Sequence, residues 1–358
     1  MADSLVEHRV DGIVRRCYVG EDARSLRIEV LRRLRSLMTL DAAFFATVDP
    51  ATMLFTSAVS EEPLLAAGPL FLENEVGGAD VNRFSDLAVS GDPVARLDDA
   101  TGGVRRASRR YSEIMAPIGL GDELRVALRA GAHCWGVMCL HREDSPFGFS
   151  DRDVSIVRRL APHLAEGLRR AVLLQPTGYA TPGPAGPGIV VLDEQLSVVS
   201  VNATAEMWLA EITDADWPAS TELPVAVYAA VAQLARLEAD GQLASEVSSV
   251  RLRTGAGRWL ALHASRLSGP QGATTAVVLE PASPTQLASM LLDAHGLTPA
   301  QVRVAGLILQ GRSTNQIVNE LRISAHTVQE HLTAVFDKVG VRSRRELVAA
   351  LLSPPPPG

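Results

Sequence analysis

The sequence predicts a multidomain protein of the α+β class, in which two α/β domains precede an all-α domain of four helices. Its 358 residues are enough for two or three domains. Stretches rich in proline, at 175–188 and 281–285, divide the chain. Helical and strand-like hydrophobic patterns alternate before the second stretch, and only helical patterns follow it.

These breaks define the expected domain organisation. We expect one α/β domain with a long exit helix at 1–174, a second at 189–281 and the helical domain at 297–352. The ranges between and after them are expected to be a Pro/Gly linker (175–188), a second linker (282–296) and a disordered tail (353–358). Each domain has its own apolar residues, so we expect residues 1–286 to fold without the helical domain.

The first domain is predicted to contain helices at both ends and strands between them. Leu26, Val30, Leu34 and Leu37 form the helical stripe of an opening helix. Strands are expected at 42–48, 53–59, 124–129 and 133–140. A long helix is expected at 150–174, with Ser150 as its N-cap and Asp153 at its third position.

The second domain is predicted to open with two strands, after which Asn202 starts a helix. A further helix is expected at 223–239. Strands are then expected at 248–253, 259–266 and 274–279.

Capping residues place four helices between 297 and 352. Capping boxes are expected from Thr298 with Gln301, Ser313 with Gln316 and Ser343 with Glu346, and Ser324 supplies a fourth N-cap. Gly311 and Gly340 end the first and third of these helices.

The third of these helices is predicted to have an apolar and a polar face. The apolar face comprises Val328, Leu332, Val335, Phe336 and Val339. The polar face leaves short side chains able to reach base edges in a major groove about 12 Å wide. The preceding helix ends shortly before it, which is the helix-turn-helix arrangement.

Charge is distributed unevenly along the chain. The net charge is −7, but residues 297–352 carry +3 and the remainder carries −10. This is the distribution expected when only the last domain meets phosphates. Lys338 is the only lysine, which excludes a phosphate-binding G-x-x-x-x-G-K loop, and no Gly-x-Ser-x-Gly or His-Glu-x-x-His motif occurs. We therefore expect no enzymatic activity.

Resemblances to known families support this division. Residues 133–149 and the helix after them resemble the end of a GAF domain, with its Trp-Gly strand and long last helix, and the similarity extends over about 22–174. Asn202, Ala203, Ala205 and Glu206 resemble the helix start of a PAS domain. The resemblances imply sensor domains that bind a small-molecule effector, without a resident cofactor.

Residues 297–352 resemble the helix-turn-helix of the LuxR family of regulators. The matching positions are Leu297, Thr298, Gly311, Asn315, Ile317, Leu321, Ile323, Ser324, Thr327, Val328, His331, Lys338, Gly340, Val341, Arg344, Glu346 and Leu347. Gln301 and Gln329 depart from the family pattern, which usually has Glu and a basic residue there.

The resemblance implies a transcriptional regulator and assigns residues to DNA. It implies that the bases are contacted by Gln329, Glu330 and Thr333. It implies that the phosphates are contacted by Thr327, Arg344, Lys338 and Arg312. It also implies that two protomers contact each other through Leu347, Val348, Leu351 and Leu352. The implied partners are double-stranded DNA and a second copy of the chain, with RNA polymerase a further candidate. Because Gln329 and Glu330 reduce the positive charge, the alternative is an interaction adaptor that has lost DNA binding.

Several other polar residues have competing interpretations. Cys17, Cys134 and Cys139 are too few and scattered for a disulfide framework, which favours a cytoplasmic protein, as does the lack of a membrane segment. His133, Cys134, Cys139 and His141 could serve metal or redox chemistry, but their spacing along one strand favours ordinary strand residues and no metal. The arginines of 105–110 favour a solvated loop over an anion site.

Overall fold

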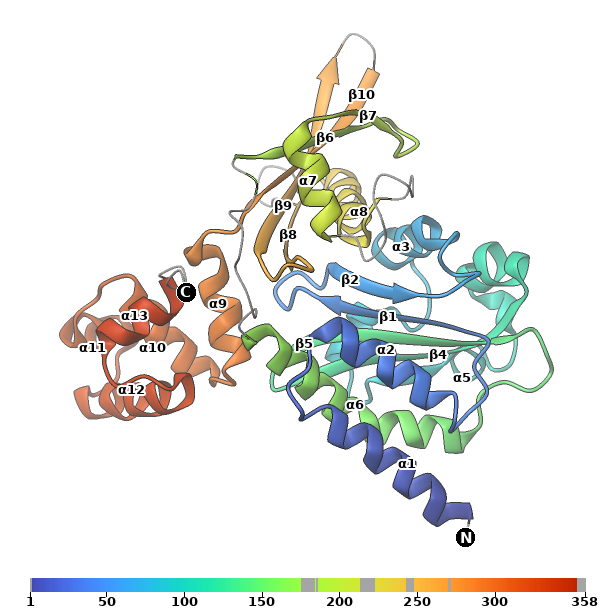
Figure 1. Cartoon of the computed structure of the whole chain (residues 1–358), viewed down its shortest axis with the longest axis horizontal. Coiled ribbons are helices and arrows are strands. Elements are labelled where there is room, and N and C mark those ends of the chain that lie inside the picture. Colours follow the sequence, from blue (N-terminus) through green and yellow to red (C-terminus); the bar gives the residue numbers. More distant parts are fainter. Residues whose placement is uncertain are drawn as a thin grey trace. The chain divides into compact units, whose positions relative to one another are not determined.

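The computed structural model describes residues 2–174, 184, 186–212, 223–242, 248–269 and 272–352 (Figure 1). The chain divides into two compact units, Met1–Ala171 with Gly183–Pro281, and Val172–Pro182 with Ala282–Gly358. The expected tail and most of the expected first linker fall outside the described residues. The predicted α+β class is confirmed.

The first sheet of the larger unit is antiparallel and has the strand order β2-β1-β5-β4-β3. Its strands are β1 (Ala42–Val48), β2 (Phe55–Ser60), β3 (Val94–Arg96), β4 (Leu120–Ala130) and β5 (His133–Glu143). Strands were expected at all these places except β3, which has only three residues and so offers no alternating pattern. The β4–β5 hairpin places Glu123 opposite His141.

Helices cover the first sheet. The long ones are α1 (Ala2–Arg16), α2 (Ala23–Leu34) and α6 (Asp151–Leu173), and the shorter ones are α3 (Gly68–Gly77), α4 (Phe84–Val89) and α5 (Leu97–Ala100). Short turns of helix follow at Arg105–Ala107, Tyr111–Met115 and Ala116–Ile118. The expected cap of α6 is confirmed, since the Asp153 carboxylate accepts from the Ser150 backbone N–H at 2.8 Å. The apolar stripe of α6 is buried within this chain.

The second sheet has the order β7-β6-β10-β9-β8. Its strands are β6 (Gly188–Leu192), β7 (Val198–Val201), β8 (Ser248–Arg253), β9 (Trp259–Gly269) and β10 (Gly272–Pro281), with helices α7 (Ala203–Ile212) and α8 (Val225–Ala239). Asn202 opens α7 as predicted, because its Oδ1 accepts from the backbone N–H of Ala205 at 2.8 Å. Helix α8 packs on β8 and β9.

The two sheets of the larger unit are joined by packing and by an ion pair between Asp49 and Arg251. Helix α8 lies against α3 and β2, and their buried side chains form one continuous hydrophobic cluster. Asp49, at the end of β1, is 1% exposed and accepts from the Arg251 backbone N–H and guanidinium, with Nε at 2.8 Å. This is a charge-assisted contact between residues far apart in the sequence.

The smaller unit is helical. It comprises α9 (Pro284–Ala294), α10 (Pro299–Leu309), α11 (Thr314–Leu321), α12 (Ala325–Val339) and α13 (Arg344–Leu352). The predicted capping boxes at Thr298 and Ser313 and the N-cap at Ser324 are confirmed. At Ser343 the Glu346 carboxylate accepts from the backbone N–H of Arg342 instead of Ser343, which differs from the expected box.

The prediction of a linker at 282–296 is wrong. Ser283 and Gln286 form a capping box that starts α9. Pro284 lies in the first turn, where backbone N–H groups have no acceptor within the helix, so its lack of an N–H breaks no hydrogen bond. Leu292 of α9 is buried in the same hydrophobic cluster as the helices that follow. A proline-rich stretch that suggested a break is therefore the start of a helix.

Candidate functional site

Helix α12 divides into a buried face and an exposed polar face, as predicted. Val328, Leu332 and Val335 are at most 1% exposed in the core of the smaller unit. Gln329, Glu330 and Thr333 are exposed on the other side. The Ser324 hydroxyl accepts from the Thr327 backbone N–H at 3.0 Å and fixes where the helix begins. A rigid helix thus presents polar side chains near its N-terminus.

Two contacts orient these polar side chains. The Thr333 hydroxyl donates to the backbone carbonyl of Gln329 at 3.1 Å. His326 Nε2 lies 3.5 Å from Glu330 Oε1, and both side chains are largely exposed. Solvent screening makes this His–Glu contact weak, so Glu330 remains able to accept from another donor.

The residues predicted to contact phosphate differ in how they are held. Arg344 donates to the Arg312 carbonyl at 3.3 Å and to the Thr314 hydroxyl at 2.8 Å, which ties α13 to the start of α11. Arg312 is exposed and lies 3.9 Å from Glu320. The Thr327 side chain is half-buried, and its hydroxyl contacts that of Ser324 at 2.9 Å.

Lys338 makes two contacts within the helical unit. Its Nζ donates to the Gly296 carbonyl and to Gln301 Oε1, both at 2.9 Å. Two of its three donors therefore join the end of α12 to the start of α10. Contact of Lys338 with DNA phosphate stays a prediction, because the residue is exposed.

The predicted dimer contact on α13 is also only partly available. Leu347 and Leu351 are 0% and 4% exposed in the core of the helical unit, because they pack against the other helices. They cannot also contact a second chain. Val348 and Leu352 are half-buried, and they are the members of the predicted set that remain accessible.

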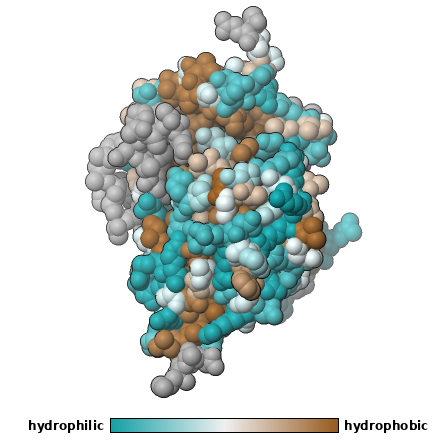
Figure 2. Space-filling model, turned by 90° about the vertical axis from the view of Figure 1, so that its right-hand side faces the viewer, coloured by the Kyte–Doolittle hydropathy of each residue, from teal (hydrophilic) through white to brown (hydrophobic). Residues whose placement is uncertain are grey.

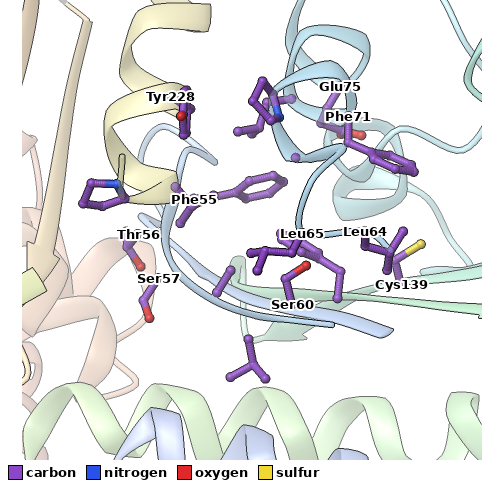
Figure 3. A pocket seen from close by; sticks show the side chains of 18 of the residues that line it. Phe55, Thr56, Ser57, Ser60, Leu64, Leu65, Phe71, Glu75, Cys139 and Tyr228 are labelled. Carbon is purple, nitrogen blue, oxygen red and sulfur yellow. The ribbon is translucent and has the colours of Figure 1, made fainter. Parts of the chain in front are cut away.

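The larger unit contains a cavity of about 600 Å³ between the first sheet, α3 and α8. Figure 3 shows Phe71 and Glu75 of α3, Phe55 of β2, Cys139 of β5 and Tyr228 of α8 around it. Aromatic rings line much of it, with Phe55 packed against Phe44 and Phe84. A cavity of this size suits a small organic molecule.

A buried charged cluster forms the sheet end of this cavity. Glu123, fully buried on β4, accepts from Arg110 Nη2 at 2.6 Å. Cys139 Sγ lies 3.0 Å from Glu123 Oε1 and 3.1 Å from His141 Nε2. Arg125 donates to Glu75 at 2.7 Å and stacks over Phe84. The prediction of a solvated arginine loop is therefore wrong for Arg110, which is 1% exposed.

The surroundings shift the pKa of each group in a definite direction. Burial would raise the pKa of Glu123, but the charges of Arg110 and Arg125 outweigh it and lower that pKa to about 2. Burial lowers the pKa of His141 to about 4, with Glu123 opposing and the arginines adding to the effect. Burial, followed by the charge of Glu123, raises the pKa of the Cys139 thiol. Near neutral pH the carboxylate is charged, and the imidazole and thiol are neutral.

The cluster could not be predicted from the residues of β5 alone. The His133 ring contacts that of Trp135 edge to face, and Cys134 Sγ donates to the Gly136 carbonyl, so both residues contact their own strand. Cys139 and His141 instead lie beside Glu123, and one carboxylate oxygen, the thiol sulfur and one ring nitrogen of the three residues lie within 4.8 Å of one another. The available signal was the alignment of 120–130 against 133–143 across the hairpin. Two guanidinium groups beside a high-pKa thiol nevertheless make the cluster a poor cation site.

The lowered pKa of His141 predicts a pH-dependent stability. Between pH 6.5 and about 4 the unfolded chain protonates this histidine and the folded chain does not, so stability falls as pH falls, by about 1.4 kcal/mol per pH unit. The measurement is urea unfolding followed by tryptophan fluorescence at several pH values. His141→Gln should flatten the slope in this window, and equal slopes in both proteins would contradict the assignment.

None of the helices within the described ranges is long and apolar enough to span a membrane.

Comparisons with known proteins match parts of the chain. Residues 295–351 match the family model for bacterial regulatory proteins of the luxR family, and residues 24–168 match the GAF domain model. The HTH-type transcriptional regulator MalT of Yersinia pestis is 40% identical over 58 residues, which are 16% of this chain and 6% of MalT. The chain thus spans only 6% of the length of this curated relative.

Solved structures resemble parts of the chain more distantly. The GAF domain of an Acinetobacter phosphoenolpyruvate-protein phosphotransferase is 14% identical, with a TM-score of 0.33, and the match covers 47% of this chain and 95% of that one. A Vibrio cholera VqmA–ligand–DNA complex is 17% identical, with a TM-score of 0.23, over 47% of this chain and 83% of that one. These scores are too low to assign a ligand or partner.

Proposed function

We propose that this chain, which carries a GAF domain and ends in a helix-turn-helix domain of the LuxR family of bacterial regulatory proteins, is a sequence-specific DNA-binding transcriptional regulator. The observation that carries the proposal is the exposed polar face of α12, which a capped and well-packed helical unit holds in place. Helix α12 enters the major groove, and Gln329, Glu330 and Thr333 read base edges.

Phosphate contacts complete the DNA interface. The candidates are Arg344, Arg312, Lys338 and Thr327, with Arg344 held between α11 and α13. The smaller unit has a net positive charge over 297–352 while the remainder of the chain is acidic, which favours approach of this unit alone to the phosphate backbone.

The proposal includes a homodimer and control by a small molecule. A single recognition helix buries little surface, so two chains on two half-sites are needed for a specific complex. Val348 and Leu352 of α13 are the remaining candidates for this pairing. The GAF domain, and the second domain if it acts as the PAS-type sensor that its sequence resembles, would change pairing or exposure of the DNA-binding unit. RNA polymerase is the expected further partner.

Fluorescence anisotropy of a labelled random duplex tests DNA binding by the full chain. We expect binding at low salt, and a dimer that neutralises about four phosphates should lose roughly 100-fold in affinity between about 50 and 200 mM salt. Native mass spectrometry of the complex should show two chains per duplex. An absence of binding at low salt would favour the adaptor that no longer binds DNA, and would overturn the regulator.

A further inference from the structure

Glu330 puts a negative charge on the face of α12 that we propose to meet DNA. Its side chain is 63% exposed, and its neighbours on that face, Gln329 and Thr333, are neutral. A carboxylate among DNA phosphates is repelled unless a cation lies beside it. The recognition face therefore needs a positive group close to Glu330.

His326 lies beside Glu330 and can supply this charge. It stands four residues before Glu330, so both side chains project from the same side of α12. Its Nε2 is 3.5 Å from Glu330 Oε1, and 83% of the His326 side chain is exposed. Histidine is the side chain that ordinarily gains or loses its charge between about pH 5 and 8. One proton can thus change the pair from net negative to neutral.

Within the described residues, Glu330 is the charged group that pairs with His326. Helices α10 and α11 pack on α12. The other titratable residues of these three helices and of the turn before α12 are Arg303, Glu320, Arg322, His331, Asp337 and Lys338. In this part of the structure none of them forms a hydrogen bond or an ion pair with the His326 ring. Glu330 is therefore the group of this unit that favours a proton on His326.

The free chain and a DNA complex favour different states of His326. His326 is the second residue of α12, where the partial positive charge of the helix N-terminus disfavours an imidazolium. Water also screens the attraction between His326 and Glu330. In a groove the phosphates favour the imidazolium, and the loss of water strengthens its attraction to the carboxylate. DNA binding therefore draws a proton onto the pair.

Each charge of the helical unit matters because the remainder of the chain repels DNA. Hydrophilic side chains cover much of the face seen in Figure 2, but the chain outside 297–352 carries a net charge of −10. Attraction to phosphates thus depends on residues 297–352, whose net charge of +3 becomes +4 with a proton on His326. A single proton is a large part of this excess.

We propose that His326 is a positioning residue for base reading by Glu330, and that it takes up a proton from solvent when α12 binds DNA. The imidazolium donates from Nε2 to one oxygen of Glu330 and offsets the repulsion between this carboxylate and the phosphates. The other carboxylate oxygen stays free to accept from a cytosine amino group. The inference rests on the proposed DNA binding and adds a partner for Glu330 to it.

The proton uptake gives DNA binding a definite pH dependence. The bound chain holds one proton more than the free chain, so affinity is highest at low pH and falls as pH rises through the range in which histidine titrates. A proton held about tenfold more tightly in the complex than in the free chain raises Kd about fivefold per bound chain between about pH 6.5 and 8.5.

Fluorescence anisotropy of a labelled random duplex with the full chain, at fixed low salt and at pH 6.5 and 8.5, measures this dependence. His326→Gln removes the titrating group and should abolish most of it. His326→Arg supplies a permanent charge and should bind about equally at both pH values, with the affinity that the wild type reaches only at pH 6.5. The matched control is His331→Gln, at a half-buried position of the same helix, which should keep the wild-type pH dependence. Persistence of that dependence in His326→Gln would overturn the proposal.

Glu330→Gln tests whether His326 acts through Glu330. The variant removes the repulsion, so it should bind the random duplex more tightly than the wild type at pH 8.5, and by a smaller factor at pH 6.5. Its pH dependence should be reduced because His326 loses its acceptor. A full wild-type pH dependence in Glu330→Gln would show that His326 contacts phosphate independently, and would overturn the proposal.

The same titrations separate this inference from the proposed function. Binding by the wild type with equal Kd values at both pH values would overturn the role of His326 and leave the DNA-binding regulator intact. An absence of binding at either pH would overturn the regulator, and this inference with it.

Discussion

Replacement of Arg110 by Met is expected to destabilise the larger unit by about 3–5 kcal/mol. Arg110 is 1% exposed, and its guanidinium donates to Glu123 through Nε and Nη2 and to the Val81 carbonyl. Met keeps much of the volume but leaves the Glu123 carboxylate buried without its principal partner. Urea unfolding followed by tryptophan fluorescence measures the effect, because every tryptophan precedes residue 282 and so reports on this unit.

Two further variants separate loss of the ion pair from loss of packing. Arg109→Met changes the neighbouring arginine, which pairs with Glu113 on the surface, and should leave the unfolding curve unchanged. Arg110→Met combined with Glu123→Leu removes both charges and should recover part of the lost stability. If the double variant were less stable than Arg110→Met, the buried charge would not be the cause.

Alanine at Gln329 or Glu330 is expected to relax base preference at one position of the DNA site each. A glutamine can pair bidentately with adenine and a glutamate can accept from the cytosine amino group, so each loss should reduce discrimination by about 1–3 kcal/mol, or roughly 5- to 150-fold. The measurement is the ratio of Kd values for the preferred duplex and its single-base variants.

Two controls accompany this prediction. Asp337→Ala changes another exposed residue of α12, close to its C-terminal end, and should leave the ratios unchanged. Arg344→Ala should weaken binding to all duplexes alike and reduce the salt slope by about one. Base ratios that are unaltered in Gln329→Ala and Glu330→Ala would remove these residues from the recognition face.

The helical unit could be predicted closely from the sequence because its signals are local. The cap side chains of Thr298, Ser313 and Ser324 each accept from a backbone N–H three residues further along the chain. The spacing of the apolar residues in α12 follows from the helical repeat alone. The same local reasoning failed at Pro284, where proline in a first helical turn and proline in a linker give the same residue pattern.

The buried cluster could not be predicted because its members come together only in the folded sheet. Glu123 and His141 become neighbours through strand register, and Arg110 reaches them from a short helical turn after α5. The internal hydrogen bonds of Lys338 were not predicted for a related reason, since Gly296 and Gln301 approach it only when α10 packs on α12. The burial of Leu347 and Leu351 likewise depends on which side of α13 meets the other helices.

Selection of bound sequences from a random duplex pool tests most directly whether α12 reads DNA. The full chain is compared with its Gln329→Ala, Glu330→Ala and Arg344→Ala variants. We predict an enriched site with two half-sites for the wild type, altered preferences at different positions for the first two variants, and the wild-type preference with weaker binding for Arg344→Ala. Identical preferred sequences from all four proteins would contradict the account.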